Sequence, residues 1–134
     1  ATLYGLADTI FKPYQQADLR RFIVTGDDVN LGDGATTGLA MVFHELATNA
    51  AKYGALSTAA GRVSVSWQRE GDILAIRWQE DDGPPIQGPP EKQGFGSMVL
   101  RNTITRRLGG DLSSHWEKHG LIVDIALPAS RLGD

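Results

Sequence analysis

A single amphipathic segment, residues 35–53, places the strongest constraint on what this chain can fold into. Gly54 follows it, in the place where a glycine in the left-handed conformation commonly ends a helix. The segment therefore predicts a long helix from about Ala35 to Tyr53. Its apolar residues recur at three- and four-residue spacing, the period of one face of an α-helix: they are Leu39, Val42, Phe43, Leu46 and Ala50.

Three polar residues form a row on the same predicted helix. Glu45, Asn49 and Lys52 follow one another at i, i+4 and i+7, within an arc of roughly 60° beside the apolar stripe. An acid, an amide and a base in one row offer a proton acceptor, a metal or hydrogen-bond ligand, and a cation for phosphate. The alternative is a solvated helix face, which is the commoner origin of such charge patterns.

The size and charge of the chain exclude several classes of protein. Its 134 residues suit one domain, and its formal charge of −3 argues against a general nucleic-acid-binding surface. The lack of cysteine rules out disulfides and thiolate metal sites and fits a reducing compartment. The sequence has no signal-peptide pattern, and no apolar run approaches the ~20 residues that a membrane span needs. We therefore expect a cytoplasmic domain that makes no membrane contact.

Alternation of apolar residues with period two predicts two β-hairpins. The first turns at Glu70-Gly71-Asp72 and places Trp78 on the inner face of its second strand, and the second turns at residues 118–120. Two stretches rich in β-branched or aromatic residues predict shorter strands before the long helix. The predicted strands, in chain order, are residues 21–25, 29–31, 62–69, 73–80, 111–117 and 121–127.

Two further helices complete the expected fold. Residues 1–16 have apolar residues at helical spacing up to Pro13, and residues 97–108 predict a later helix. Few helices among hairpin-linked strands predict an α+β fold, a two-layer sandwich whose mixed, mostly antiparallel sheet is covered by helices on one face. The first helix is expected to be the remnant of a link to an upstream dimerisation domain, with one domain at 17–130 and a tail at 131–134. The apolar residues that the later helix is expected to bury are Met98, Val99, Leu100, Ile104 and Leu108.

The segment between the hairpins, residues 81–96, has the composition of a functional or mobile loop. It holds four prolines and four glycines, and Gly94-Phe95-Gly96 opens the following helix. The free N–H groups and the positive dipole end of that helix favour an anion, and plain turn chemistry is the alternative. Val99 breaks the G-x-G-x-x-G fingerprint and no P-loop pattern is present, so any phosphate is bound by another architecture.

An acidic cluster, Glu80-Asp81-Asp82, stands where a predicted strand ends and the loop begins. A carboxylate in that position can accept a hydrogen bond from an exocyclic amine such as that of adenine. An ordinary acidic turn is the alternative, and the cluster becomes informative only in combination with the polar row and the glycine-rich loop.

That combination, in this order, resembles the GHKL ATPase superfamily, and most closely the catalytic ATP-binding domain of HWE-family sensor histidine kinases. The family is named for a histidine in its asparagine box and a Trp-x-Glu in its first glycine box. Here His44 begins HELATNAAKYG, and Trp78-Gln79-Glu80 supplies the second signature. Gly94-Phe95-Gly96 resembles the second glycine box, and the resemblance extends from about Arg20 to Pro128.

The resemblance implies roles for five residues around a nucleotide. Asn49 would ligate a Mg²⁺ ion that bridges the ATP phosphates, Lys52 would contact phosphate, and Glu45 would act as general base or orienting carboxylate. Glu80 stands where the family's adenine-recognising carboxylate lies, with Asp81 as the alternative if the register differs by one.

Other residues are implied in the lid over the nucleotide. Gly83, Gly94 and Gly96 would shape the lid and the backbone that faces phosphate. Phe95 would pack on the lid or the nucleotide, or anchor the loop from below. His44 is a signature residue of the catalytic region, although its chemistry does not follow from its position, and a polar residue on the shoulder of the helix is the alternative.

One residue departs from the family pattern. Members usually carry Glu-x-Gly-Gly-Pro, whereas Asp82 occupies the place of the first glycine here. If that position needs a positive φ, aspartate tolerates it only moderately. Its charge near a polyanion is also expected to weaken nucleotide binding unless the side chain faces away.

The implied reaction is transfer of the ATP γ-phosphoryl group to a histidine on a separate dimerisation domain of the same kinase. We expect no acceptor in this chain, and His115 and His119 are predicted to be exposed residues of the last hairpin. A response regulator and a full-length homodimer are the further partners implied. Two alternatives remain: a degenerate module that docks a response regulator without ATP turnover, and a GHKL serine kinase of the anti-sigma type.

Overall fold

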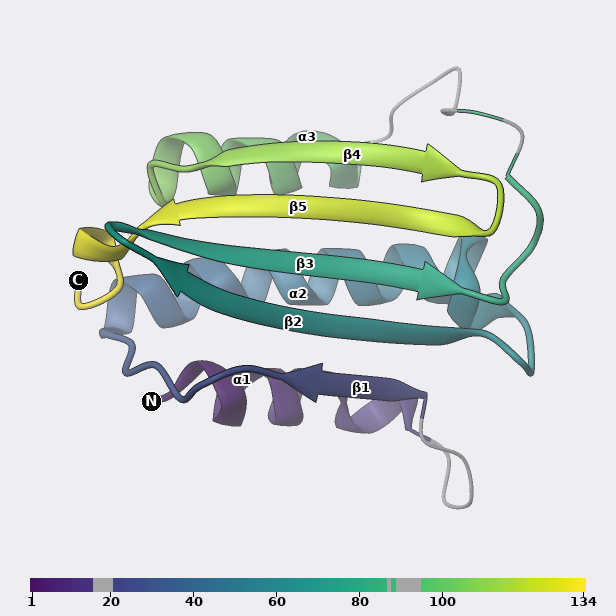
Figure 1. Cartoon of the computed structure of the whole chain (residues 1–134), viewed down its shortest axis with the longest axis horizontal. Coiled ribbons are helices and arrows are strands. Elements are labelled where there is room, and N and C mark those ends of the chain that lie inside the picture. The colour runs from purple at the N-terminus through teal and green to yellow at the C-terminus, as the bar shows by residue number, and fades with distance from the viewer. Residues whose placement is uncertain (16–20, 87, 89–94) are drawn as a thin grey trace.

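The protein has two layers, a five-stranded sheet and a layer of helices behind it (Figure 1). The computed structural model describes residues 1–15, 21–86, 88 and 95–134. The sheet has the order β1-β2-β3-β5-β4, in which β1 and β2 run parallel and every other pair is antiparallel. The predicted fold class is confirmed. The strands are β1 Phe22–Thr25, β2 Arg62–Glu70, β3 Ile73–Asp81, β4 Asp111–Glu117 and β5 Gly120–Pro128.

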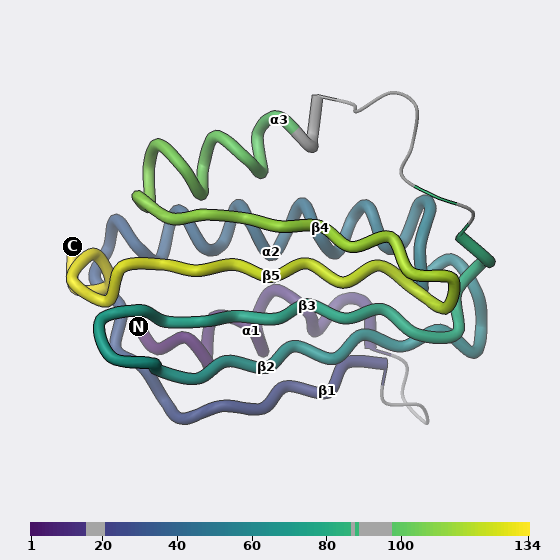
Figure 2. The backbone as a smooth tube through the Cα atoms, turned by 45° about the horizontal axis from the view of Figure 1, so that its top comes forward, coloured from purple at the N-terminus to yellow at the C-terminus, as the bar shows by residue number. Residues whose placement is uncertain are grey.

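Three α-helices cover one face of the sheet in the described part of the chain, and the two views agree on their place (Figures 1 and 2). They are α1 Leu3–Phe11, α2 Asp33–Tyr53 and α3 Phe95–Asn102. A five-residue π-turn, Thr103–Arg107, continues α3, and the N–H of Leu108 donates to the carbonyl of Thr103 over 2.9 Å. None of the helices in the described residues has the length and apolar content to cross a bilayer.

The inner face of α2 carries the core, as its periodicity predicts. All five apolar residues of the predicted stripe are at most 3% exposed, and Trp78 on the inner face of β3 is 0% exposed. Alternate residues of β2, β3 and β5 meet the helices, because successive side chains of a strand point to opposite faces of the sheet.

α1 is part of the same core. The ring of Phe11 stacks on that of Phe22 in β1, with centroids 4.3 Å apart and planes 6° apart, and it also contacts Phe43 of α2 and Trp78. Leu3 and Ala7 are fully buried beside it. The helix expected as a linker remnant therefore contributes core residues to this domain.

Three local expectations are wrong. Residues 29–31 form no strand: one bridge joins Asn30 to Thr2, because the backbone of this stretch bonds to the first residues of the chain. Gly54 is not in the left-handed conformation, since its φ is −115° and its ψ −148°. Met98 is 58% exposed and Val99 half-buried, while Leu100 is buried, so α3 buries a narrower stripe than predicted.

Candidate functional site

The polar row lies on the carboxyl-terminal half of α2. Glu45 and Asn49 are half-buried and Lys52 is exposed, at successive turns of one helix. Among the residues that the structure describes, none donates to or accepts from the side-chain amide of Asn49, and none pairs with Glu45 or Lys52. His44, next to Glu45, is exposed.

Glu80 lies where the carboxyl ends of β3 and α2 come together, at one end of the molecule (Figures 1 and 2). Its carboxylate is 4% exposed, and each of its oxygens accepts one hydrogen bond. The backbone N–H of Ala55 donates to Oε1 over 2.9 Å, and the indole Nε1 of Trp78 donates to Oε2 over 2.9 Å. Both oxygens retain acceptor capacity for another donor.

The Trp-x-Glu spacing has a direct structural reason. Residues two apart on a strand point to the same face of the sheet, so the indole N–H of Trp78 reaches the carboxylate of Glu80. Burial raises the pKa of Glu80 above its ordinary value, while the hydrogen bonds from Trp78 and Ala55 oppose the rise. A carboxylate with this environment is a candidate recognition group rather than a random strand residue.

Close backbone approach explains two glycines beside this carboxylate. A β-carbon on Gly54 would collide with Oε1 of Glu80, which is why the residue after α2 is a glycine without being a left-handed cap. A β-carbon on Gly83 would lie 2.7 Å from Cα of Ala55. Larger residues at either position would push the end of β3 away from the end of α2.

Asp81 and Asp82 lie apart from the Glu80 carboxylate. Asp81 follows Glu80 in the strand and points to the opposite face, where Nε2 of Gln79 lies 3.5 Å from its Oδ1. Asp82 has a φ of 59°, which is the positive value that a glycine adopts without cost. Its side chain is exposed, and its carbonyl accepts a hydrogen bond from Oγ1 of Thr58 over 2.9 Å.

α3 runs antiparallel to α2. A β-carbon on Gly38, near the start of α2, would lie 2.7 Å from Leu108, just beyond α3, so the amino end of α3 is directed toward the half of α2 that carries the polar row. Phe95 and Gly96 are the first two residues of α3. Gly94 and the other lid residues at 87 and 89–93 lie outside the described residues, while the N–H of Ile86 donates to the carbonyl of Lys118 over 3.4 Å.

Solved structures with this architecture are histidine kinase domains. The chain aligns with the blue-light-activated histidine kinase EL346 of Erythrobacter litoralis with a TM-score of 0.76 at 22% identity, over 96% of this chain and 41% of that one. It aligns with the catalytic domain of histidine kinase ThkA with a TM-score of 0.73 at 16% identity, over 96% and 94% of the two chains. These likenesses establish the fold.

Sequence comparison finds relatives of higher identity than these solved structures. The chain is 40% identical over 126 residues to blue-light-activated histidine kinase 1 of Erythrobacter litoralis, and 40% identical over 114 residues to a blue-light-activated histidine kinase of Rhizobium johnstonii. These alignments cover 92% and 82% of this chain. The chain is thus a homologue of these blue-light-activated histidine kinases, which are of the HWE type. It spans about one third of the length of these curated relatives, 34% and 32%, and no family model matches it.

The sequence alone missed two residues that hold the Glu80 carboxylate directly or through a neighbour. Ala55, the first residue after Gly54, supplies a donor to the carboxylate, and Arg21 donates to the carbonyl of Ala55. An arginine before a short strand carries no distinguishing pattern, and an alanine contributes through its backbone. Neither has a sequence signal that would have identified it.

The residues of α2 are consistent with a Mg²⁺ ion near Asn49. An amide oxygen is a hard ligand of the kind Mg²⁺ accepts, and this ion usually retains several waters and takes its other ligands from phosphates. No group of three or more histidine, aspartate or glutamate side chains is placed to hold a metal within the described ranges. A single protein ligand completed by phosphate and water is the arrangement that the side chains permit.

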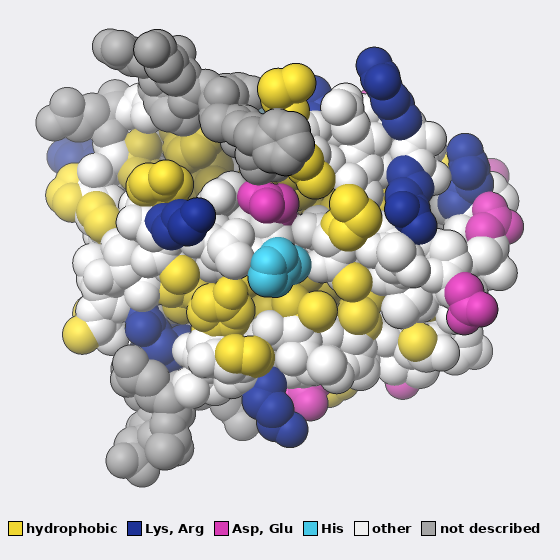
Figure 3. All heavy atoms as spheres, turned by 180° about the vertical axis from the view of Figure 1, so that it is seen from behind, with side chains coloured by type: hydrophobic (Ala, Val, Ile, Leu, Met, Phe, Trp, Pro, Cys, Tyr) yellow, Lys and Arg dark blue, Asp and Glu magenta, His cyan; other side chains and the backbone are white. Residues whose placement is uncertain are grey.

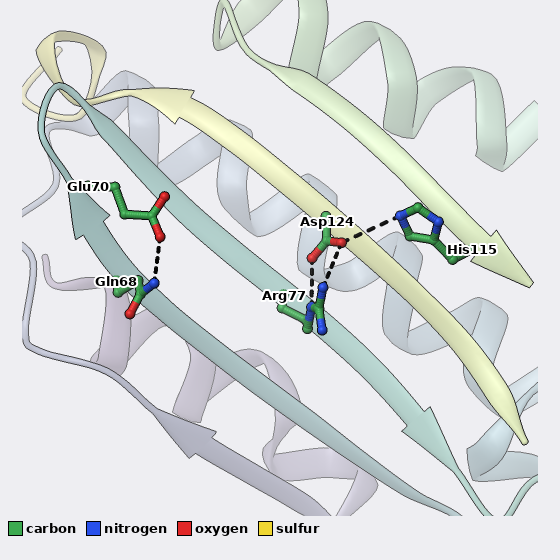
Figure 4. Close-up of polar contacts among 5 residues, drawn as sticks. All are labelled: Gln68, Glu70, Arg77, His115 and Asp124. Atoms are coloured by element: carbon green, nitrogen blue, oxygen red, sulfur yellow. Dashed lines mark hydrogen bonds and ion pairs between the residues drawn. The ribbon is translucent and has the colours of Figure 1, made fainter. Parts of the chain in front are cut away.

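The two faces of the molecule differ in character. On the helix side, hydrophobic side chains show between polar ones, with Lys and Arg side chains around them (Figure 3). The open face of the sheet carries a polar cluster in which Arg77 forms a two-point ion pair with Asp124, at 2.8 and 3.0 Å, and His115 lies 3.5 Å from the same carboxylate (Figure 4). His115 and His119 are exposed, as predicted.

A shallow hollow of about 510 Å³ on the open face includes Arg77, Ser113 and Asp124. It lies on the side of the sheet opposite to Glu80 and the polar row, because alternate strand residues face opposite ways. Exposed ion pairs of this kind contribute little to stability. The hollow also includes none of the site residues that the family motifs predict.

Proposed function

We propose that this chain binds ATP and transfers its γ-phosphoryl group to a histidine on a separate dimerisation domain of the same kinase. The observation that carries the proposal is the buried carboxylate of Glu80. Two N–H groups hold it at the end of the molecule where α2 presents Asn49 and Lys52. A fixed acceptor for an exocyclic amine and a cation for phosphate are thereby available on adjoining elements.

We assign the side chains of β3 and α2 to the parts of the nucleotide. Glu80 accepts from the amine of adenine, Asn49 holds Mg²⁺, and Lys52 neutralises phosphate charge. When bound, Mg²⁺ supplies electrostatic stabilisation of the charge on the transferring phosphoryl group. Glu45 orients the attacking imidazole or accepts its proton. His44 lies beside Glu45 at the catalytic end of the row.

We also assign roles to the glycines and Phe95 of the predicted lid. Gly83 keeps the end of β3 against the turn after α2, and Gly94, Phe95 and Gly96 offer backbone N–H groups to phosphate at the start of α3. We assign Asp81 no contact with adenine, because it points to the other face of the sheet. Phosphoryl transfer needs positioning and charge neutralisation above all, and these residues supply both.

The partners follow from the same proposal. A histidine-bearing dimerisation domain delivers the acceptor, the full-length kinase is a homodimer, and a response regulator receives the phosphoryl group. Histidine kinase ThkA, whose fold this chain shares with a TM-score of 0.69, has been solved in complex with the response regulator TrrA. We place the reaction in the cytoplasm, and we extend the kinase domain from the expected residues 17–130 to include α1, which shares its core.

Calorimetry with ATP in the presence and absence of Mg²⁺ tests nucleotide binding. Asn49→Ala is expected to bring the affinity measured with Mg²⁺ down to the value measured without it, because the variant lacks the only proposed protein ligand. Asn30→Ala, an exposed amide at the far end of α2, is the matched control and should retain the full Mg²⁺ effect. Failure of the unchanged chain to bind ATP with Mg²⁺ would contradict the proposal and favour a docking module.

Transfer is tested by mixing the chain with ATP and a histidine-bearing dimerisation domain. Phosphohistidine is labile in acid and stable in base, whereas phosphoserine shows the opposite behaviour. An acid-labile phosphoprotein is expected. An acid-stable product would assign the chain to the serine kinases instead.

A further inference from the structure

Arg21 is a buried cation whose partners in the described residues are all backbone carbonyls. Its side chain is 6% exposed. Nε and Nη2 donate to the carbonyl of Gly61 over 3.1 and 3.0 Å, and Nη2 also donates to the carbonyls of Ala55, over 3.2 Å, and Thr58. Burying a guanidinium is costly unless such bonds replace its hydration. Here the bonds that offset this cost all go to carbonyls of one short turn.

That turn, residues 55–61, connects α2 to β2 and includes the residue that binds Glu80. Ala55 is 1% exposed; its carbonyl accepts from Arg21 and its N–H donates to Oε1 of Glu80. A β-carbon on Gly61 would collide with the carbonyl of Ala55, so the turn is closed tightly around this residue. Ala55 is therefore held from both sides by the two buried charged side chains of the described chain.

The backbone of Arg21 is itself fixed in the sheet. Its carbonyl accepts from the N–H of Val63 over 2.8 Å, where β1 pairs with β2, and its own N–H donates to the side chain of Gln15 over 3.0 Å. Because the backbone of Arg21 is fixed at the start of the edge strand, its guanidinium fixes the position of the turn relative to the sheet.

We propose that Arg21 is a positioning residue for recognition of the adenine base, acting through the turn 55–61 to hold the N–H of Ala55 against the carboxylate of Glu80. The proposal rests on the assignment of Glu80 to the base in the proposed function. Without the N–H of Ala55, one oxygen of Glu80 loses its donor and the carboxylate is held by Trp78 alone. Arg21 makes no contact with the nucleotide in this account, and its Nε and Nη2 donors are engaged by the turn.

Discrimination between ATP and inosine triphosphate provides the test. Inosine carries a carbonyl in place of the exocyclic amine, so a carboxylate acceptor favours ATP. Arg21→Met is expected to lower the ratio of ATP affinity to inosine triphosphate affinity about ten-fold, the order expected for a lost hydrogen bond to a charged group. Glu80→Gln should lower the ratio at least as much, and the double variant no further, because both act on the same carboxylate.

Arg62→Met, an exposed arginine at the start of β2, is the matched control and should leave the ratio unchanged. A purely structural role for Arg21 would weaken both nucleotides equally and overturn the proposal. If the unchanged chain binds neither nucleotide, the proposed function fails. If it prefers ATP and Glu80→Gln loses the preference while Arg21→Met retains it, only the role of Arg21 fails.

A milder variant retains the test if Arg21→Met does not fold. Arg21→Lys keeps the charge but has fewer donors in a different geometry, so it cannot reach all three carbonyls. Hydrogen exchange of the Ala55 amide is expected to accelerate about ten-fold in Arg21→Lys relative to the slow amides of α2, with a smaller fall in the nucleotide ratio. Unchanged exchange at Ala55 together with an unchanged ratio would overturn the proposal.

Discussion

At the scale of single residues, the site depends on a carboxylate that is buried and still has acceptor capacity. Glu80 is buried at the end of a strand, yet each of its oxygens receives only one N–H donor. The hydrogen bond from Trp78 explains why a tryptophan two residues earlier is useful there. A hydrophobic residue without an N–H in that position would leave one oxygen of the carboxylate without a partner.

The ionisation of Glu80 makes stability depend on pH. Because its pKa in the folded protein lies above its ordinary value of 4.5, folded protein binds more protons than unfolded protein in the interval between the two values. The free energy of unfolding contributed by this group therefore falls as the pH rises from about 4.5 through that interval. Urea unfolding of the unchanged chain and of Glu80→Gln, from pH 4.5 to 7.5, should show this fall only in the unchanged chain.

Both proteins contain every other titrating group, so they provide each other's control. Glu80→Gln is expected to be less stable at low pH, because an amide cannot accept from both Ala55 and Trp78. Parallel pH profiles for the two proteins would contradict the raised pKa of Glu80.

Asp82 is the second residue whose chemistry follows from its conformation. A positive φ is uncommon outside glycine, although aspartate and asparagine adopt it more readily than most residues. The departure from the glycine of the family pattern is therefore accommodated by the backbone. Its remaining effect is electrostatic, since an exposed negative charge lies at the entrance to the loop over the proposed phosphates.

Asp82→Asn isolates that charge, because asparagine keeps the tolerance for positive φ. ATP affinity is expected to rise about two- to five-fold at low salt, with the gain shrinking as salt is added. Thermal unfolding should change little. Asp72→Asn, an exposed aspartate in the turn at the other end of β3, serves as the control for net charge. Equal affinities for the two variants would show that the Asp82 charge does not act on the phosphates.

At the scale of elements, α1 and α2 share one aromatic cluster with β1 and β3. Phe11 stacks on Phe22 and contacts Phe43 and Trp78, so it joins both helices to the sheet. The same Trp78 donates to Glu80 through its indole nitrogen. Trp78 thus contacts both Phe11 of the first helix and Glu80, the proposed base-recognition group.

Phe11→Ala tests whether α1 is part of the cooperative unit. The variant leaves a cavity among buried rings and should lower the free energy of unfolding by about 3–5 kcal/mol. Tyr4→Ala, on the exposed side of the same helix, should cost less than about 1 kcal/mol. Urea unfolding followed by tryptophan fluorescence measures both. A change of less than about 1 kcal/mol for Phe11→Ala would mean that α1 is dispensable to the domain.

At the scale of the whole molecule, the two faces of the sheet have different roles. The inner face binds the helices and ends at Glu80, while the outer face carries exposed polar pairs such as that of Arg77 and Asp124. The connections after α2 and after β3 meet at one end of the sandwich, where Thr58 donates to the carbonyl of Asp82. The proposed nucleotide site thus lies between the layers at one end, with the open face left free.

The sequence by itself determined α2, both hairpins and the two-layer fold class, because period 3.6 and period two are local patterns that packing reinforces. It also suggested Glu45, Asn49 and Glu80 as site residues, from motifs visible within single elements, and their roles remain predictions. Only the tertiary structure decided how Arg21, Ala55 and Glu80 meet. Those contacts join residues 34 and 25 positions apart, through backbone atoms that every residue possesses. No side-chain pattern encodes such contacts, so they emerge only when the ends of the strands and helices are brought together.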